Sequence, residues 1–231
     1  MADTQQPSNV LRQTSAPRSR VLVLLAGLSA VAWLLFAVLE AQGAEDPETL
    51  VKQGDRAYSR GDMLVAMASY REAAEAGHAP AQVRLGYVLD QAEENVEAAR
   101  WYERAAQQGL AEGLYRYGQL HITGEGVKRD VEKGVALVQR AAEGGFVLAH
   151  LTLARGYESG TGGLRRDDAK ARSHWNRAAD LGDRSAMERL AAAARGGELG
   201  MPPDAVAAQD WEKRLRALRS GASAASSGEA R

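Results

Sequence analysis

Two stretches of this 231-residue chain decide its fold: residues 130–145, DVEKGVALVQRAAEGG, and residues 167–182, DDAKARSHWNRAADLG. Each begins with an acid, places a small residue four positions later and a large one four positions after that, and ends with Ala-Ala and then Gly. Residues spaced by three and four lie on one face of an α-helix. Because a short acceptor side chain favours a helix start and Gly favours a helix end, each stretch predicts one helix with an acidic N-cap and a glycine C-cap.

The same pattern occurs twice more toward the N-terminus, in residues 62–77 and 94–109, so the Ala-Ala pairs recur at intervals of 32, 36 and 37 residues. Such intervals indicate a helical repeat. A first helix in each unit is marked by its own column of small residues, which are Gly54, Gly86, Gly118, Ala154 and Ala191. Five units result. The fifth is degenerate, with Ala207 and Trp211 in the second-helix columns, as expected of a terminal repeat.

This pattern resembles that of a known repeat family. The third and fourth units, with Gly124-Glu125-Gly126, Gly160-x-Gly162 and the Ala-Ala columns, are similar to Sel1-like repeats, which are relatives of the tetratricopeptide repeat. The first two units lack the Gly-x-Gly loop and look more like plain tetratricopeptide repeats. The resemblance implies a right-handed α-solenoid, an all-α fold. The chain has no cysteine and therefore departs from the Sel1 proteins whose repeats are stapled by disulfides.

A hydrophobic segment precedes the repeats. Residues 21–39, VLVLLAGLSAVAWLLFAVL, contain no charge and are long enough for a transmembrane helix. Three arginines precede the segment and four acids follow it closely, which predicts a cytoplasmic leader and a repeat domain in the bacterial periplasm. A retained single-pass inner-membrane anchor is the favoured interpretation. Small residues at Ala41 and Gly43 leave open cleavage after Gly43, which would give a soluble periplasmic protein.

The predicted organisation therefore has five parts: a basic leader at 1–20, the membrane or signal helix at 21–39, a linker at 40–47, the repeat domain at 48–218 and a disordered tail at 219–231. The formal net charge is −1, with both signs interspersed along the repeats. Because nucleic-acid binding requires a basic patch, this composition predicts no nucleic-acid partner.

No catalytic, cofactor-binding or metal-binding residues are predicted. The four histidines show no i, i+3 or i+4 spacing, and the glycine-rich segments lack the lysine of a phosphate-binding loop. His121 occupies the column of Tyr157 in the next unit, which predicts a packing role. The sequence thus indicates a protein that is not an enzyme.

The resemblance implies that the first helices line the concave face, where their non-column positions would contact a partner. These residues are Asp55, Tyr58, Val83, Tyr87, Asp90, Tyr115, Gln119, Arg155, Glu158, Glu188 and Arg195. Tyr87 and Tyr115 suit protein binding because large amphipathic side chains are common at interface hot spots. The alternative is that such residues pack between adjacent first helices.

Two functional hypotheses follow. The first is a membrane-anchored periplasmic adaptor or scaffold that holds a protein or peptide partner of the cell envelope on its concave face. The alternative is a cleaved, soluble periplasmic protein that binds a cell-envelope glycan or regulates an envelope enzyme. Family resemblance, not site chemistry, supports both hypotheses.

Overall fold

The computed structural model of the chain describes residues 45–228, with side chains as far as Leu218. The hydrophobic segment predicted at 21–39, the leader and most of the linker lie outside the described residues. Within residues 45–228, no helix is both long enough and apolar enough to cross a bilayer.

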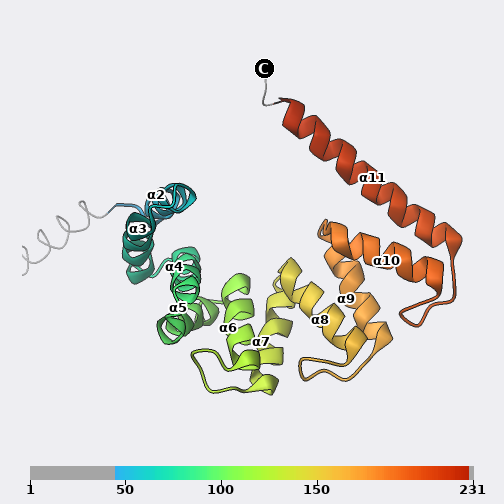
Figure 1. Cartoon of the computed structure of the whole chain (residues 1–231), viewed down its shortest axis with the longest axis horizontal. Coiled ribbons are helices and arrows are strands. Elements are labelled where there is room, and N and C mark those ends of the chain that lie inside the picture. The colour runs from blue at the N-terminus through green and yellow to red at the C-terminus, as the bar shows by residue number, and fades with distance from the viewer. Residues whose placement is uncertain (1–44, 229–231) are drawn as a thin grey trace, which may run out of the picture. The chain divides into compact units, whose positions relative to one another are not determined.

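The described chain is entirely helical, which confirms the predicted all-α fold (Figure 1). Nine of its ten helices are 13 residues long. The helices are α2 (Pro47–Ser59), α3 (Met63–Glu75), α4 (Ala79–Gln91), α5 (Asn95–Gln107), α6 (Ala111–Thr123), α7 (Val131–Glu143), α8 (Val147–Ser159), α9 (Asp168–Asp180), α10 (Arg184–Gly196) and α11 (Ala205–Gly228).

Consecutive helices pair as the repeat pattern predicts. The pairs α2/α3, α4/α5, α6/α7, α8/α9 and α10/α11 form five units, and each unit packs on the next through the second helix of one and the first helix of the other. First helices also touch one another, α2 with α4 and α4 with α6.

The column residues build the core. Each Ala-Ala pair is buried, as are the large residues of the second helices, among them Tyr102. The ring of Tyr102 lies directly against Gly86, where an added Cβ would be 2.7 Å from the ring atom Cε1. In the first two units a glycine in the first helix thus accommodates an aromatic ring from the second, and Gly54 lies against Tyr70 in the same way.

The predicted helix ends are confirmed for the glycines and only partly for the acids. The four column glycines have positive φ, as a left-handed C-terminal turn requires. Asp130 and Asp167 accept hydrogen bonds from the main-chain N–H groups of Lys133 and Lys170, both at 3.0 Å.

The side chains of Asp62 and Glu94 make no capping hydrogen bond, so the predicted capping role is wrong for these two residues. The backbone explains the difference. Asp130 and Asp167 have extended φ values of −151° and −154°, whereas Asp62 and Glu94 follow tight turns with φ near −80°.

Two further expectations, on the columns of the fifth unit and on the tail that follows it, differ from the structure. Its acid is Asp204, which accepts from the N–H groups of Val206 and Ala207, and its buried small residue is Ala208, one position after the predicted Ala207. The tail predicted to be disordered from residue 219 is helical as far as Gly228. Its Ala- and Ser-rich sequence contains no proline, so a helix already begun at Ala205 can continue through it.

Candidate functional site

Five of the eleven predicted partner-binding residues line two small pockets, Asp55, Tyr58 and Tyr87 in one and Gln119 and Arg155 in the other. One pocket of about 150 Å³, the α2–α4 pocket, is lined by Asp55, Tyr58, Tyr70, Arg84, Tyr87 and Val88. The other, of about 210 Å³, is the α6–α8 pocket, and Gln119 and Arg155 line it together with apolar side chains from α6, α7, α8 and the following loop. We call the surface that carries both pockets the inner face.

Aromatic rings form the wall of the α2–α4 pocket. The centroids of the Tyr58 and Tyr87 rings are 6.3 Å apart and their planes are tilted by 60°. A hydrogen bond with Tyr87 raises the pKa of the Tyr58 hydroxyl, which stays neutral. The guanidinium of Arg116 lies over the Tyr87 ring at 5.4 Å, so aromatic and cationic groups from three successive first helices are in contact.

Acidic residues of the same region are held by neighbours. Asp55 accepts from the hydroxyl of Tyr70 at 2.7 Å and from Nε of Arg84 at 3.2 Å, which joins α2, α3 and α4. Partial burial, followed by the carboxylate of Glu125, raises the pKa of Asp90, and Arg116 opposes this effect. Asp55 therefore shapes the pocket rather than offers free charge.

The α6–α8 pocket is mostly apolar, with polar groups at its edge. The hydroxyl of Tyr115 is 3.3 Å from that of Thr152 on α8 and accepts a hydrogen bond from the Gln119 amide at 3.0 Å. Arg155 is exposed, and its guanidinium lies 5.9 Å from the Trp175 ring. An apolar side chain in the pocket would therefore lie beside an exposed cation and an amide.

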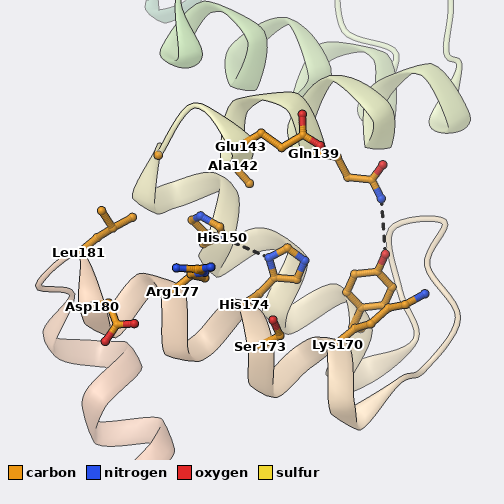
Figure 2. A pocket seen from close by; sticks show the side chains of 12 residues that line it. Gln139, Ala142, Glu143, His150, Lys170, Ser173, His174, Arg177, Asp180 and Leu181 are labelled. Carbon is orange, nitrogen blue, oxygen red and sulfur yellow. Dashed lines mark hydrogen bonds between the residues drawn. The ribbon is translucent and has the colours of Figure 1, made fainter.

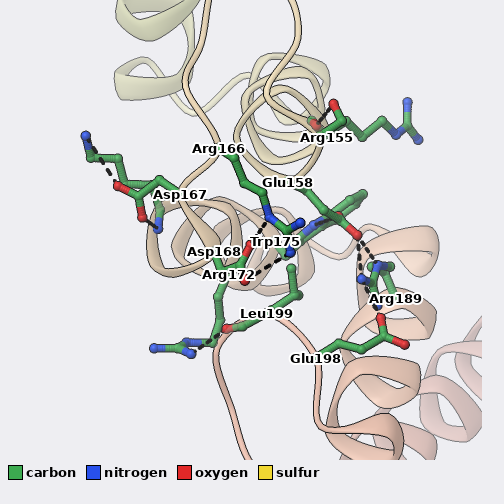
Figure 3. Close-up of polar contacts among 12 residues, drawn as sticks. Arg155, Glu158, Arg166, Asp167, Asp168, Arg172, Trp175, Arg189, Glu198 and Leu199 are labelled. Atoms are coloured by element: carbon green, nitrogen blue, oxygen red, sulfur yellow. Dashed lines mark hydrogen bonds and ion pairs between the residues drawn. The ribbon is translucent and has the colours of Figure 1, made fainter.

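Of the other predicted residues, Glu158 and Arg195 join neighbouring helices, and Figure 3 shows the contacts of Glu158. Glu158 accepts from Trp175 Nε1 at 2.9 Å and from Arg189 Nε at 3.0 Å, so it joins α8, α9 and α10. Glu188 pairs with Arg184 on the same helix, and Arg195 pairs with Glu212 of α11 at 2.9 Å.

Val83 corrects the prediction, because its side chain is only 2% exposed and cannot contact a partner in this conformation. Helix α4 packs on α2, α3, α5 and α6, so its buried surface is wider than the column residues alone suggest.

A larger groove, which no sequence pattern indicated, lies between the second helices α7 and α9, with α8 at its floor (Figure 2). We call it the α7–α9 groove. Its volume is about 870 Å³. The Nδ1 atoms of His150 and His174 lie 3.1 Å apart in it, and the Tyr157 ring stacks on His174 with centroids 5.8 Å apart.

The two histidines are 24 residues apart, so a search for helical spacing could not pair them. The available signal was a polar residue in both of two core columns of one repeat, because the other full repeats place a polar residue in at most one of them, as with Gln82 and Ser69.

The described residues hold no cluster of three or more His, Cys, Asp or Glu side chains that could bind a metal ion. His121 is buried against Tyr117, with ring centroids 4.6 Å apart, in agreement with its predicted packing role.

Comparisons with known proteins agree with this geometry. A family model described as Sel1 repeat matches residues 79–110, 111–146, 148–183 and 184–211. No curated protein sequence matches the chain.

Solved structures of bacterial proteins also match. A Sel1 repeat protein from Oxalobacter formigenes is 28% identical with a TM-score of 0.63, and the match covers 76% of this chain and 72% of that one. The antigen c5321, described as a protective antigen present in uropathogenic Escherichia coli strains displaying an SLR fold, is 28% identical with a TM-score of 0.64. That match covers 78% of this chain and 39% of the antigen. A putative sel1 repeat protein from Klebsiella pneumoniae subsp. pneumoniae is 22% identical with a TM-score of 0.53, and the match covers 78% of this chain and 89% of that one. This match supports the fold alone.

Proposed function

Since this chain belongs to the Sel1 repeat family, we propose that it is a non-catalytic scaffold that holds a segment of a partner protein on its inner face. The observation that carries the proposal is the pair of inner-face pockets, which are lined by residues from successive first helices. One pocket has an aromatic wall and the other an apolar interior with Arg155 at its edge. Aromatic and arginine side chains at such places are typical of protein-binding hot spots.

The geometry favours a protein partner over a glycan. Glycan binding would use aromatic faces exposed as flat platforms. The Tyr58 and Tyr87 rings are instead tilted by 60°, and Arg116 covers part of the Tyr87 ring. A side chain inserted from a partner suits this concave shape better.

Location is part of the same proposal. The uncharged residues 21–39, the arginines before them and the acids after them support a single-pass inner-membrane anchor with the repeats in the periplasm. The partner would then be a protein of the cell envelope. Cleavage after Gly43 is the alternative, and it would give a soluble periplasmic scaffold.

The test is photo-crosslinking in cells of the full-length chain, with the photoreactive group placed in turn at Tyr87, at Gln119 and at Glu132. Glu132 is exposed on the second helix α7 and serves as the control. We expect one discrete protein adduct from Tyr87 and Gln119 and none from Glu132. Adducts of equal yield from all three positions, or from none, would overturn the proposed use of the inner face.

A C-terminal tag on the same chain tests the location. We expect a full-length product that protease digests from outside in spheroplasts. A tagged product shortened to a start near Ala44 would replace the anchor with the cleaved form.

A further inference from the structure

The α6–α8 pocket has room for a single side chain. Its volume of about 210 Å³ is below the roughly 300–1,000 Å³ of pockets that hold drug-sized molecules. Its apolar lining consists of Ile122 from α6, Val135 and Val138 from α7, Leu153 from α8 and Leu164 from the following loop, and none of the lining side chains is aromatic. A branched aliphatic side chain therefore matches this interior.

The pocket repeats the position of the α2–α4 pocket two units later. Asp55, Tyr87, Gln119 and Arg155 occupy one column of the first helices, at intervals of 32, 32 and 36 residues. The first two residues line the α2–α4 pocket, and the last two line the α6–α8 pocket. The column changes from an acid that is already paired with Arg84 to an arginine, so the two pockets differ in the charge that they offer to a partner.

Arg155 is a cation without an acidic partner within residues 45–218. Glu158, one turn further along α8, already accepts from Trp175 and from Arg189. Figure 3 shows the Arg155 guanidinium pointing away from Glu158. Because the Arg155 side chain is exposed, a negative charge on a bound segment can reach it.

The amide of Gln119 is held in position at the same pocket. Its Nε2 atom donates to the hydroxyl of Tyr115 at 3.0 Å, and that hydroxyl lies 3.3 Å from the hydroxyl of Thr152. The second hydrogen of Nε2 and the Oε1 atom have no partner in the part of the chain whose side chains are described. An amide in this state can donate to a carbonyl group and accept from an N–H group of a peptide main chain.

We propose that the α6–α8 pocket recognises a partner segment in which a branched aliphatic side chain lies next to an acidic residue. The aliphatic side chain enters the pocket, the carboxylate pairs with Arg155, and the Gln119 amide binds the main chain beside them. A segment with a basic residue in place of the acid would bring two cations together. The inference rests on the proposed scaffold function and names the kind of segment that one of its two pockets binds.

The two side-chain contacts differ in strength and in their response to salt. Burial of a Leu side chain changes affinity by about 10- to 100-fold. An exposed ion pair changes affinity by up to about fivefold, and salt weakens this contribution alone. The aliphatic side chain should therefore supply most of the affinity, and the acid should select among segments.

The experiment uses the full-length chain in detergent, with ¹³C-labelled methyl groups on Ile, Leu and Val. The probes are capped octapeptides of Gly and Ser that carry Leu-Asp, Ala-Asp or Leu-Lys at the centre. We expect millimolar Leu-Asp peptide to shift the methyl NMR signals of Ile122 and Leu164, and to leave that of Val96, which is exposed on α5, unchanged. At low salt it should bind at least about tenfold more tightly than the Ala-Asp peptide and about fivefold more tightly than the Leu-Lys peptide.

A charge reversal makes the test specific. Arg155→Glu should make the Leu-Lys peptide bind more tightly than the Leu-Asp peptide, and it should retain the fold because the side chain is exposed. Arg140→Glu makes the same change of charge at an exposed position of α7 outside the pocket, and should keep the preference for Leu-Asp.

Equal binding of the Leu-Asp and Leu-Lys peptides to the native chain would overturn the proposal. So would unmoved signals of Ile122 and Leu164, or equal binding of the Leu-Asp and Ala-Asp peptides. Crosslinks from Tyr87 and Gln119 in cells, obtained together with any of these results, would retain the scaffold function and reject only the proposed kind of segment.

Discussion

At the residue scale, equivalent positions in this solenoid differ in how their polar atoms are satisfied. Tyr70 and Tyr102 occupy the same column, and burial raises the pKa of both hydroxyls, which therefore stay protonated. The Tyr70 hydroxyl donates to Asp55 at 2.7 Å. The Tyr102 hydroxyl is buried and finds no hydrogen-bond partner in the described part of the chain.

The two tyrosines should respond in opposite directions to loss of the hydroxyl. Because an unpaired buried hydroxyl is unfavourable, Tyr102→Phe should raise the free energy of unfolding by about 1 kcal/mol, whereas Tyr70→Phe should lower it by about 1 kcal/mol. Urea unfolding followed by circular dichroism measures both variants under identical conditions. Equal effects of the two substitutions would contradict the difference in hydrogen bonding.

At the element scale, the helix starts differ in the same way. Asp130→Ala removes a side chain that caps α7, so it should lower the free energy of unfolding by about 1 kcal/mol. Asp62→Ala is the matched control, because Asp62 makes no capping bond and its pair with Arg60 is exposed. Its effect should be below about 0.5 kcal/mol. A larger loss in the control, measured by the same urea unfolding, would show that the acidic column acts through charge rather than through capping.

The helices and their packing could be predicted because each column repeats the same physical requirement. Alanine between close helices recurs in every full unit, and glycine lies opposite an aromatic ring in the first two units, as Gly86 and Tyr102 illustrate. Burial of Val83 could not be predicted in this way, since it depends on how many neighbours surround α4.

The pairing of His150 with His174 could not be predicted either, because the two residues lie on different helices of one unit and the pair occurs only once. The inner-face residues lie between these cases. Their helices were predictable, but their partners, such as Arg189 for Glu158, were not.

At the scale of the whole repeat array, each of the longer loops joins the two helices of one repeat and also contacts the preceding repeat. The α8–α9 loop places Gly163 against Val131 at the start of α7, and the α6–α7 loop places Gly126 against Asn95 at the start of α5. The α10–α11 loop does the same through Leu199, whose carbonyl accepts from Arg172 of α9 at 2.7 Å (Figure 3). Each of the last three repeats thus reaches back to the one before it, and contacts between neighbours are what stabilise a solenoid.

Two glycines of the α8–α9 loop, substituted one at a time, should distinguish the stability that comes from this contact from the stability that comes from the turn itself. Gly162 and Gly163 both have positive φ, so an alanine at either position introduces backbone strain of about 1 kcal/mol. At Gly162 the new methyl group meets no atom within 4 Å, whereas at Gly163 it would overlap Cγ1 of Val131. Gly163→Ala should therefore lower the free energy of unfolding by about 1–3 kcal/mol more than Gly162→Ala.

The excess loss should be confined to the junction between the third and fourth repeats. Hydrogen exchange should show faster exchange in α7 and α8 for Gly163→Ala than for Gly162→Ala, with α2 and α3 unchanged in both, because each repeat contacts only its neighbours. Equal unfolding free energies for the two variants would mean that these glycines serve the turn alone. In that case the loops would not couple the repeats, and the stack would depend on helix packing only.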